Sequence, residues 1–124
     1  MQFDRKYLLW GFAYAIVGML LGIVMAASGN HAQHVAHAHV LLVGFVISMI
    51  YAVIHRLWLN NLRSLLSRLQ FALHHAGAVT MFTGLYLLYG NGSNPELLHP
   101  ILGAASLAVL TGLVLMAVMV IRTR

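Results

Sequence analysis

The sequence contains no cysteine. This absence excludes disulfides, thiolate metal sites and the CxxCH motif that attaches c-type heme covalently. Acidic residues are nearly absent as well, because Asp4 and Glu96 are the only two carboxylate side chains in 124 residues. Catalysis by paired carboxylates is therefore close to excluded, and the sequence also shows no phosphate-binding loop and no credible nucleophilic triad.

Charged residues of either sign make up 7% of the chain, whereas apolar residues make up 61%. This composition is typical of membrane proteins and differs from that of soluble domains. The net charge of +5 comes from basic residues that flank apolar runs and form no basic stripe interleaved with aromatics. We therefore expect membrane lipid as the surroundings and no nucleic-acid partner.

Four apolar stretches are long enough to cross a bilayer, which takes about 20 helical residues. They cover about residues 8–27, 36–59, 65–89 and 101–121. The sequence therefore predicts an all-α fold, an integral membrane four-helix bundle that forms one domain over residues 1–124. A signal peptide is the alternative for the first stretch, but this run exceeds the usual h-region of about 7–15 residues, so we interpret it as a retained span.

Turn signals separate these stretches. Ser28-Gly29-Asn30 and Asn60-Asn61 are predicted to break the first and second helices. The last helix begins either at the cap Asn94, with Pro95 and Glu96 in its first turn, or at Pro100. Two ladders of small residues spaced four apart predict close helix packing. They are Gly18, Gly22 and Ala26 in the first stretch and Ala104, Ala108 and Gly112 in the fourth.

All basic residues fall on one side of the membrane if the chain crosses it four times. They are Arg5, Lys6, Arg56, Arg63, Arg68, Arg122 and Arg124. By the positive-inside rule both termini are then cytoplasmic, N-in and C-in. We expect a multi-pass protein of a bacterial-type inner (cytoplasmic) membrane.

The chain has eight histidines, and several fall inside the predicted spans. An ionisable side chain within a span is costly, so its presence indicates function by default. His37 and His39 open the second span, and His74 and His75 lie in the first half of the third. His31, His34 and His99 map to the outward side in wet surroundings, and His55 is interpreted as interfacial. Tyr51, Tyr86 and the methionines are interpreted as packing and interfacial residues.

The second predicted span contains a recognisable histidine motif. His37-Ala38-His39 is followed by Gly44-Phe45 and then by His55-Arg56-Leu57-Trp58. This pattern resembles the HxH helix of subunit I of the heme–copper oxidase superfamily, and the spacing of Gly44 is most similar to the cbb-type oxidases and nitric oxide reductases. The whole chain also resembles short, four-span proteins akin to that subunit. The resemblance implies that His37 ligates a high-spin heme and His39 a low-spin heme.

The chain is too short to carry the further spans and the copper site of those oxidases, and no CuB histidine set can be assigned. Oxygen or nitric oxide reduction is therefore not expected. We expect a b-type heme (iron) protein that serves electron transfer or redox or gas sensing with a redox partner, and that is not an enzyme.

The expected heme ligands are His37, His39, His74 and His75, with His39 and His74 mattering most to heme retention. His39 opens an aliphatic face and has no evident polar neighbour on its own helix, and Gly77 and Ala78 leave room for a macrocycle beside His74. His39 and His74 differ in depth by about 10–15 Å. A ligand from another subunit would remove that gap, and we expect a homo-oligomer.

Two other hypotheses belong to different classes. In the first, the outward histidines handle copper or zinc, with His31, His34, His37, His39 and His99 as an entry site. In the second, the protein is a structural or assembly partner without cofactor, and the small-residue ladders carry its role.

Overall fold

The computed structural model describes residues 1–123. This part of the chain is helical, with no strands. Its elements are α1 (Phe3–Ser28), α2 (His34–His39), the π-helical segment η1 (Val40–Val46), α3 (Ile47–Leu57), α4 (Leu65–Leu88) and α5 (Pro95–Arg122). Because α2, η1 and α3 form one continuous helix, the structure has four helices long and apolar enough to cross a membrane, as predicted.

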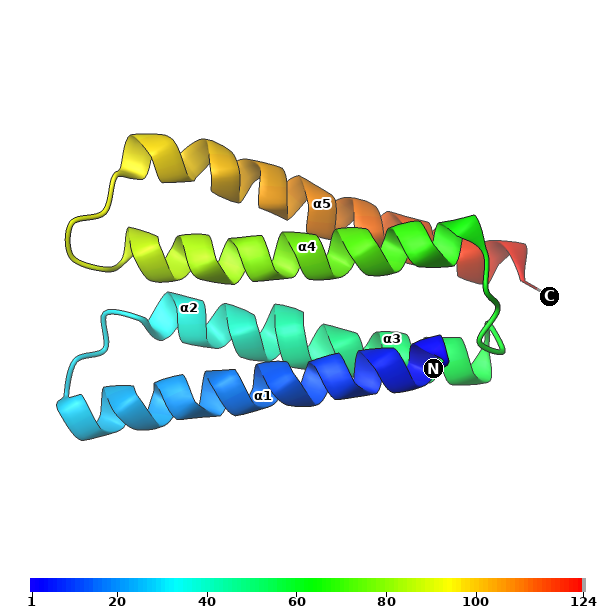
Figure 1. Ribbon diagram of the computed structural model, residues 1–124, viewed down its shortest axis with the longest axis horizontal. Helices are drawn as coiled ribbons and strands as arrows, with labels where there is room; N and C mark the ends of the chain where they lie inside the picture. The colour runs from blue at the N-terminus through cyan, green and yellow to red at the C-terminus, as the bar shows by residue number, and fades with distance from the viewer. Residues whose placement is uncertain (124) are drawn as a thin grey trace.

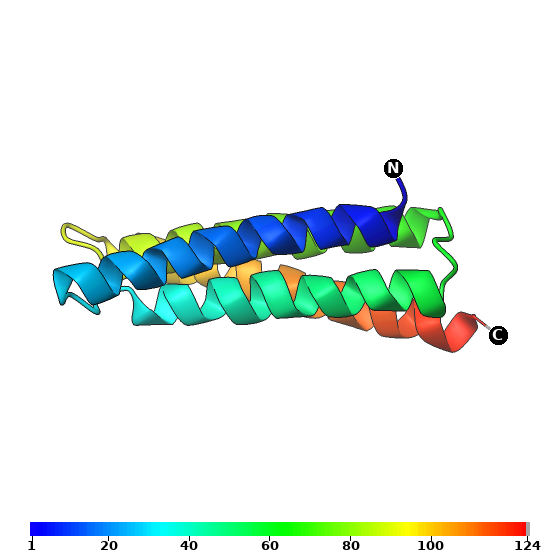
Figure 2. The same cartoon turned by 90° about the horizontal axis from the view of Figure 1, so that it is seen from below.

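The helices form two antiparallel hairpins that lie against each other (Figures 1 and 2). One hairpin pairs α1 with the α2–η1–α3 helix, and the other pairs α4 with α5. Both termini and the α3–α4 loop lie at one end of the bundle, and the other two loops lie at the opposite end. The basic side chains of the described residues therefore gather at the end that carries the termini.

The helix ends follow the turn signals of the sequence. Gly29 ends α1 with a left-handed backbone (φ 70°), a conformation that favours glycine. Asn60 and Asn61 also have positive φ (52° and 55°), which turns the chain after α3. The last helix begins at Pro95, where the Asn94 side chain accepts a hydrogen bond from the backbone N–H of Leu97 at 3.4 Å. It then passes through Pro100 without a break.

The first ladder of small residues packs against the second helix. A Cβ atom placed on Gly18 would lie 2.6 Å from the side chain of Leu41, and one on Gly22 would lie 2.8 Å from the imidazole of His37. These distances are shorter than any ordinary contact. The two glycines therefore set how closely α1 approaches α2 and η1, as the sequence predicted. The prediction for Ala26 was wrong, because this residue is exposed.

The π-helical segment aligns the inner face of the second helix. Ala36, Val40, Gly44 and Ser48 are all buried and succeed one another by four residues. In a plain α-helix each such step turns the face by about 40°, so the row would wind away from the neighbouring helices. The wider π turn offsets this rotation. His37 lies one position beside this row and is half-buried.

Helices α4 and α5 also meet through small residues. A Cβ on Gly77 would lie 3.0 Å from the carbonyl oxygen of Ala105 and 3.0 Å from the Cβ of Ala108. The prediction for Ala104 was wrong, because this residue is exposed and Ala105 is buried instead. The contact face of α5 repeats every seven residues, through Leu98, Ala105, Gly112 and Met119. This spacing drifts by only about 20° per repeat, so the face stays turned toward the neighbouring helix.

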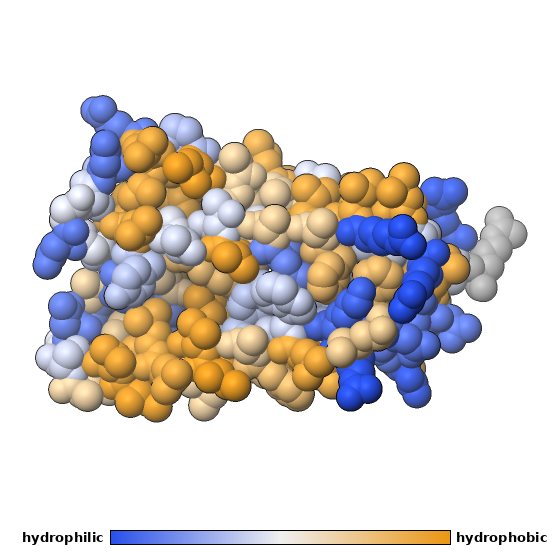
Figure 3. All heavy atoms as spheres, in the orientation of Figure 1, coloured by the Kyte–Doolittle hydropathy of each residue, from blue (hydrophilic) through white to orange (hydrophobic). Residues whose placement is uncertain are grey.

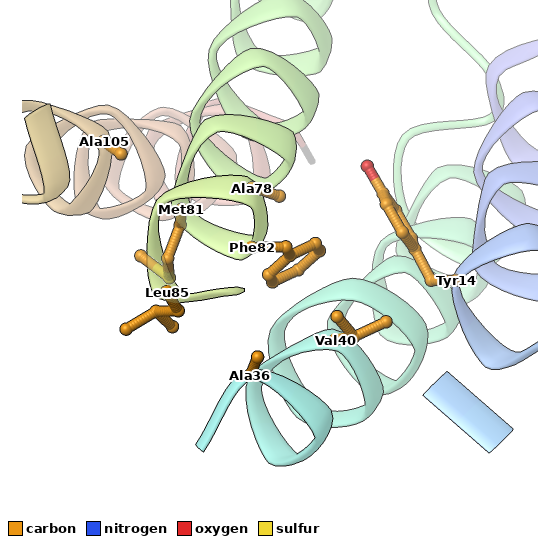
Figure 4. Close-up of a cluster of buried hydrophobic side chains, with 8 residues drawn as sticks. All are labelled: Tyr14, Ala36, Val40, Ala78, Met81, Phe82, Leu85 and Ala105. Atoms are coloured by element: carbon orange, nitrogen blue, oxygen red, sulfur yellow. The ribbon is translucent and has the colours of Figure 1, made fainter. Parts of the chain in front are cut away.

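Buried side chains between the hairpins form two clusters. The first, in the half of the bundle away from the termini, includes Tyr14, Val40 and Phe82, and Figure 4 shows these side chains converging from three helices. The second, nearer the termini, includes Tyr7, Tyr51 and Met116. On the face shown in Figure 3, apolar side chains cover much of both hairpins between more polar ends, as expected for a membrane bundle.

Replacing Gly77 by alanine should destabilise the bundle, whereas replacing Gly103 should not. The new methyl group at Gly77 meets backbone on α5, and such overpacking costs about 1–3 kcal/mol. At Gly103 nothing lies within 4 Å of the new Cβ. Unfolding free energies measured by circular dichroism during denaturant titration in detergent would test this difference, and equal losses for both variants would contradict the packing.

Candidate functional site

The layer between the two hairpins is rich in histidine and aromatic side chains. Helix α4 places Gln70, His74 and His75 in this layer, and all three are buried. Helix α1 contributes Tyr7 and Tyr14 from the opposite side. The sequence interpretation singled out the two histidines but not these tyrosines. The signal that would have found them is the spacing of the buried residues of α1 by four and three, through Phe3, Tyr7, Gly11, Tyr14 and Gly18.

His75 joins the two hairpins. Its Nδ1 atom and the Tyr14 hydroxyl are hydrogen-bonded at 2.8 Å. The indole of Trp10 stacks on the imidazole with the ring centroids 4.4 Å apart and an interplanar angle of 26°. On the other side, the ring of Phe71 meets His75 edge-on at 4.5 Å. His75 is thus held on three sides, and its ring orientation is fixed.

His74 is enclosed even more fully. It is completely buried, and its Nε2 atom lies 3.4 Å from the Ser48 hydroxyl, at the long limit for a hydrogen bond. The ring of Tyr51 meets it edge-on at 5.0 Å. The expectation of room for a macrocycle beside Gly77 and Ala78 is wrong, because α5 packs directly on Gly77 and Ala78 is itself fully buried.

His55 is also buried, although the sequence suggested an interfacial position. Its ring lies parallel to those of Phe3 and Tyr7, at centroid distances of 5.0 and 5.5 Å. Neither of its ring nitrogens has a hydrogen-bond partner among the described residues. The tyrosine beside it, Tyr7, donates a hydrogen bond to the side-chain oxygen of Gln70. The start of α1 covers His55, a long-range contact that the local sequence does not show.

Several polar atoms of this layer lack a protein partner in the described chain. They are both ring nitrogens of His55, Nδ1 of His74, Nε2 of His75 and Nε2 of Gln70. Buried polar atoms are satisfied in the great majority of cases, so a group of exceptions marks a functional candidate. The described residues nevertheless contain no set of three His, Asp or Glu side chains that converges on one metal position.

The HxH pair lies nearer the opposite end of the bundle, and both of its histidines are half-buried. His37 Nδ1 lies 2.8 Å from the carbonyl oxygen of Gly18 on α1, and His39 Nδ1 lies 2.8 Å from the carbonyl oxygen of Val35 on its own helix. A carbonyl only accepts, so Nδ1 carries a proton in both rings, and in the neutral form of each ring Nε2 has the lone pair. The expectation that His39 has no polar neighbour on its own helix is wrong, because its imidazole reaches the backbone carbonyl of Val35, four residues earlier.

The two histidine pairs lie at different depths. His37 packs beside Gly18 and Gly22 on α1, whereas His75 packs beside Trp10 and Tyr14. These positions differ by about eight residues, or about 12 Å along the helix. The pairs therefore do not face each other across a single ligand within one chain, in line with the depth gap expected for His39 and His74.

The other three histidines form no metal-binding group in the described residues. His31, His34 and His99 are exposed at the end of the bundle opposite the termini. The Nδ1 atoms of His31 and His34 lie near backbone carbonyl oxygens, those of Gly29 at 3.3 Å and His31 at 2.9 Å. Together with His37 and His39 they form no three-ligand group within the part of the chain that the structure describes.

Comparison with known proteins adds no relative. No family model matches the chain, and neither a curated protein nor a solved structure matches it.

Removing the Tyr14 hydroxyl should loosen the contact between the hairpins. In Tyr14→Phe the aromatic ring remains, but His75 Nδ1 loses its partner while Nε2 already has none. Leaving a buried polar atom unpaired costs about 1–3 kcal/mol of unfolding free energy.

The matched control is Tyr86→Phe, which removes a hydroxyl from a tyrosine that is 52% exposed. Thermal unfolding of both variants in the same detergent would measure the difference. If the two substitutions lowered the stability equally, the hydrogen bond between Tyr14 and His75 would not hold the hairpins together.

Proposed function

We propose that this protein binds b-type heme non-covalently through the HxH helix and serves electron transfer or redox or gas sensing in a membrane. The observation that supports this proposal is the hydrogen bond that orients the imidazole of His39. Its Nδ1–H donates to the Val35 carbonyl, which sets the tautomer and leaves Nε2 with a lone pair. Imidazoles that ligate metals are commonly oriented in this way by a hydrogen bond from the other nitrogen.

His39 is half-buried and lies beside exposed apolar residues, so it would be accessible to a heme. Its face of the helix continues through Leu42, Val46, Ile50 and Val53, all exposed apolar side chains. Such a face offers a planar macrocycle an apolar surface. His37 has the same tautomer, but α1 covers its ring, because a Cβ on Gly22 would lie 2.8 Å from Cε1 and 3.5 Å from Nε2. His39 is therefore the ligand of this proposal, and His37 packs against α1.

The interior histidines do not fit the group. His74 and His75 are enclosed by Tyr7, Tyr51, Trp10 and Phe71, and α5 fills the space beside Gly77. A macrocycle there would displace several of these rings. We therefore do not assign heme ligation to His74 or His75, and their part is to position the hairpins.

In this proposal a second copy of the chain would help to hold the heme. No histidine of the same chain lies level with His39 on its outer face, and the interior pair is about 12 Å deeper. In a homodimer, His39 of each copy would hold the heme, and the filled interior of the bundle would stay intact. When bound, heme supplies one-electron redox chemistry or a gas-binding iron, and the chain supplies the ligand, the apolar face and the exclusion of water.

Substitution of His39 by alanine should remove most of the heme from protein purified from heme-sufficient cells. The heme-to-protein ratio of the unmodified protein should be close to one heme per two chains, with a low-spin spectrum. His34→Ala is the matched control, because His34 has the same Nδ1–carbonyl hydrogen bond but lies exposed at the end of the bundle. Extraction of heme into acidified organic solvent gives the ratio, and the visible spectrum gives the spin state.

If His39→Ala retained as much heme as the control, the assignment of the heme site to His39 would be wrong. Well-folded protein without a Soret band would instead favour a cofactor-free structural or assembly partner. The observation that favours this second candidate is the filled interior of the bundle, in which Tyr7 and His74 are fully buried. The copper- or zinc-handling hypothesis gains no such observation, because no three ligands converge in the described residues.

We also propose that both termini face the cytoplasm of a bacterial-type inner membrane. The support is the gathering of Arg5, Arg56, Arg63 and the other described basic residues at the end of the bundle that carries the termini.

The absence of cysteine allows a direct test of this orientation. A membrane-impermeant maleimide applied to intact cells should label Asn91→Cys in the α4–α5 loop. It should label Leu62→Cys in the α3–α4 loop only after the membrane is opened. Both positions are exposed. The reverse pattern of labelling would overturn the orientation.

A further inference from the structure

A pocket at the end of the bundle with the termini combines positive charge and aromatic surface. It has a volume of about 300 Å³ and is lined by Phe3, Lys6, Arg63, Arg68 and Phe71. The first turns of α1 and α4 form its walls, and the α3–α4 loop contributes Arg63. The pocket thus lies where the two hairpins meet, at the ends of their membrane-length helices.

The cations of this pocket are not neutralised by the protein's acidic side chains. The sequence has two of these, Asp4 and Glu96. Asp4 pairs with Arg56 at 3.4 Å, outside the pocket. Glu96 lies in the first turn of α5, at the opposite end of the bundle. Three basic side chains therefore face one pocket without an ion-pair partner in the described chain, which is a strong local attraction for an anion.

Two of the three basic side chains are held by contacts in or beside the pocket. The Lys6 ammonium lies 5.0 Å from the ring centroid of Phe3 and 5.7 Å from that of Phe71. Such cation–π contacts keep the charge over the apolar wall. Arg63 donates a hydrogen bond to the Met1 carbonyl oxygen at 3.2 Å. A site for a small, fully hydrated anion needs no such aromatic wall.

The position of the pocket relative to the membrane indicates what occupies it. Phe3 and Arg68 lie in the first turns of α1 and α4, where headgroups end and acyl chains begin if these helices span the bilayer. Trp10 lies one turn above Lys6 and is 40% exposed. Basic pockets between membrane helices are known to bind anionic headgroups.

We propose that this pocket binds an anionic phospholipid, with the headgroup phosphate between Lys6, Arg63 and Arg68 and an acyl chain passing beside Trp10. This binding is independent of heme. It gives the end of the bundle a lipid-specific anchor, because one ligand contacts both hairpins at their junction.

Trp10 allows the binding to be measured directly. The protein has two tryptophans, so Trp58→Phe leaves Trp10 as the reporter. In an uncharged detergent, phosphatidylglycerol with brominated acyl chains should quench Trp10 fluorescence saturably. Phosphatidylcholine with the same chains should require a much higher concentration.

Two double variants of equal net charge separate the pocket from the general positive charge of this end. Lys6→Gln with Arg68→Gln removes two cations of the pocket, whereas Arg5→Gln with Arg122→Gln removes two cations outside it. The first pair should lower the apparent affinity for phosphatidylglycerol about 30-fold, as two cations of about 1 kcal/mol each imply. The second pair should leave that affinity nearly unchanged.

Three outcomes would overturn the proposal. They are equal losses in the two double variants, equal quenching by the two lipids, and complete displacement of the lipid by millimolar inorganic phosphate, which would indicate a soluble-anion site. Helix content and monodispersity confirm that each variant is folded. If the pocket double variant fails to fold, Arg68→Gln alone keeps the contacts of Lys6 with both phenylalanines and should still weaken binding about fivefold.

Discussion

The contact between the two hairpins depends on polar and aromatic side chains, and its central element is the hydrogen bond between Tyr14 and His75. Within each hairpin the backbones approach closely through glycines such as Gly18 and Gly77. Between the hairpins large rings fill the space instead. Lipid offers no hydrophobic force to bring apolar helices together, so packing and buried hydrogen bonds must do so. The histidines of α4 thus have a structural role that their membrane depth alone did not reveal.

The histidines of the HxH helix bond to backbone carbonyls and not to other side chains. Both imidazoles donate from Nδ1, one to a carbonyl on the neighbouring helix and one to a carbonyl on its own helix. The hydrogen bond of His37 joins α1 to the second helix, whereas His39 lies on the outer face and its Nε2 is free to bind the proposed heme. The wider turn of η1 keeps the inner row from Ala36 to Ser48 pointing inward. One short segment therefore serves both the packing of the bundle and the proposed ligand.

The ends of the bundle differ in chemistry. The end with the termini carries the described basic side chains, and three of them share a pocket with Phe3 and Phe71. The opposite end carries the exposed His31, His34 and His99. The proposed heme face lies nearer the second end and the proposed lipid pocket lies at the first, so the two proposals concern separate parts of the molecule.

The sequence by itself determined the number of helices long and apolar enough to cross a membrane and the turns at Gly29 and Asn60, because hydropathy and backbone preference are local properties. It also identified Gly18 and Gly22 as close-packing positions, since their spacing is visible within one helix. Only the tertiary structure decided which side chains meet. The burial of His55 beneath Phe3, the pairing of Tyr14 with His75 and the filled space beside Gly77 each join residues far apart in the chain. These contacts depend on the rotation of each helix about its axis. A π turn or a shift of one residue changes this rotation, and hydropathy does not determine it.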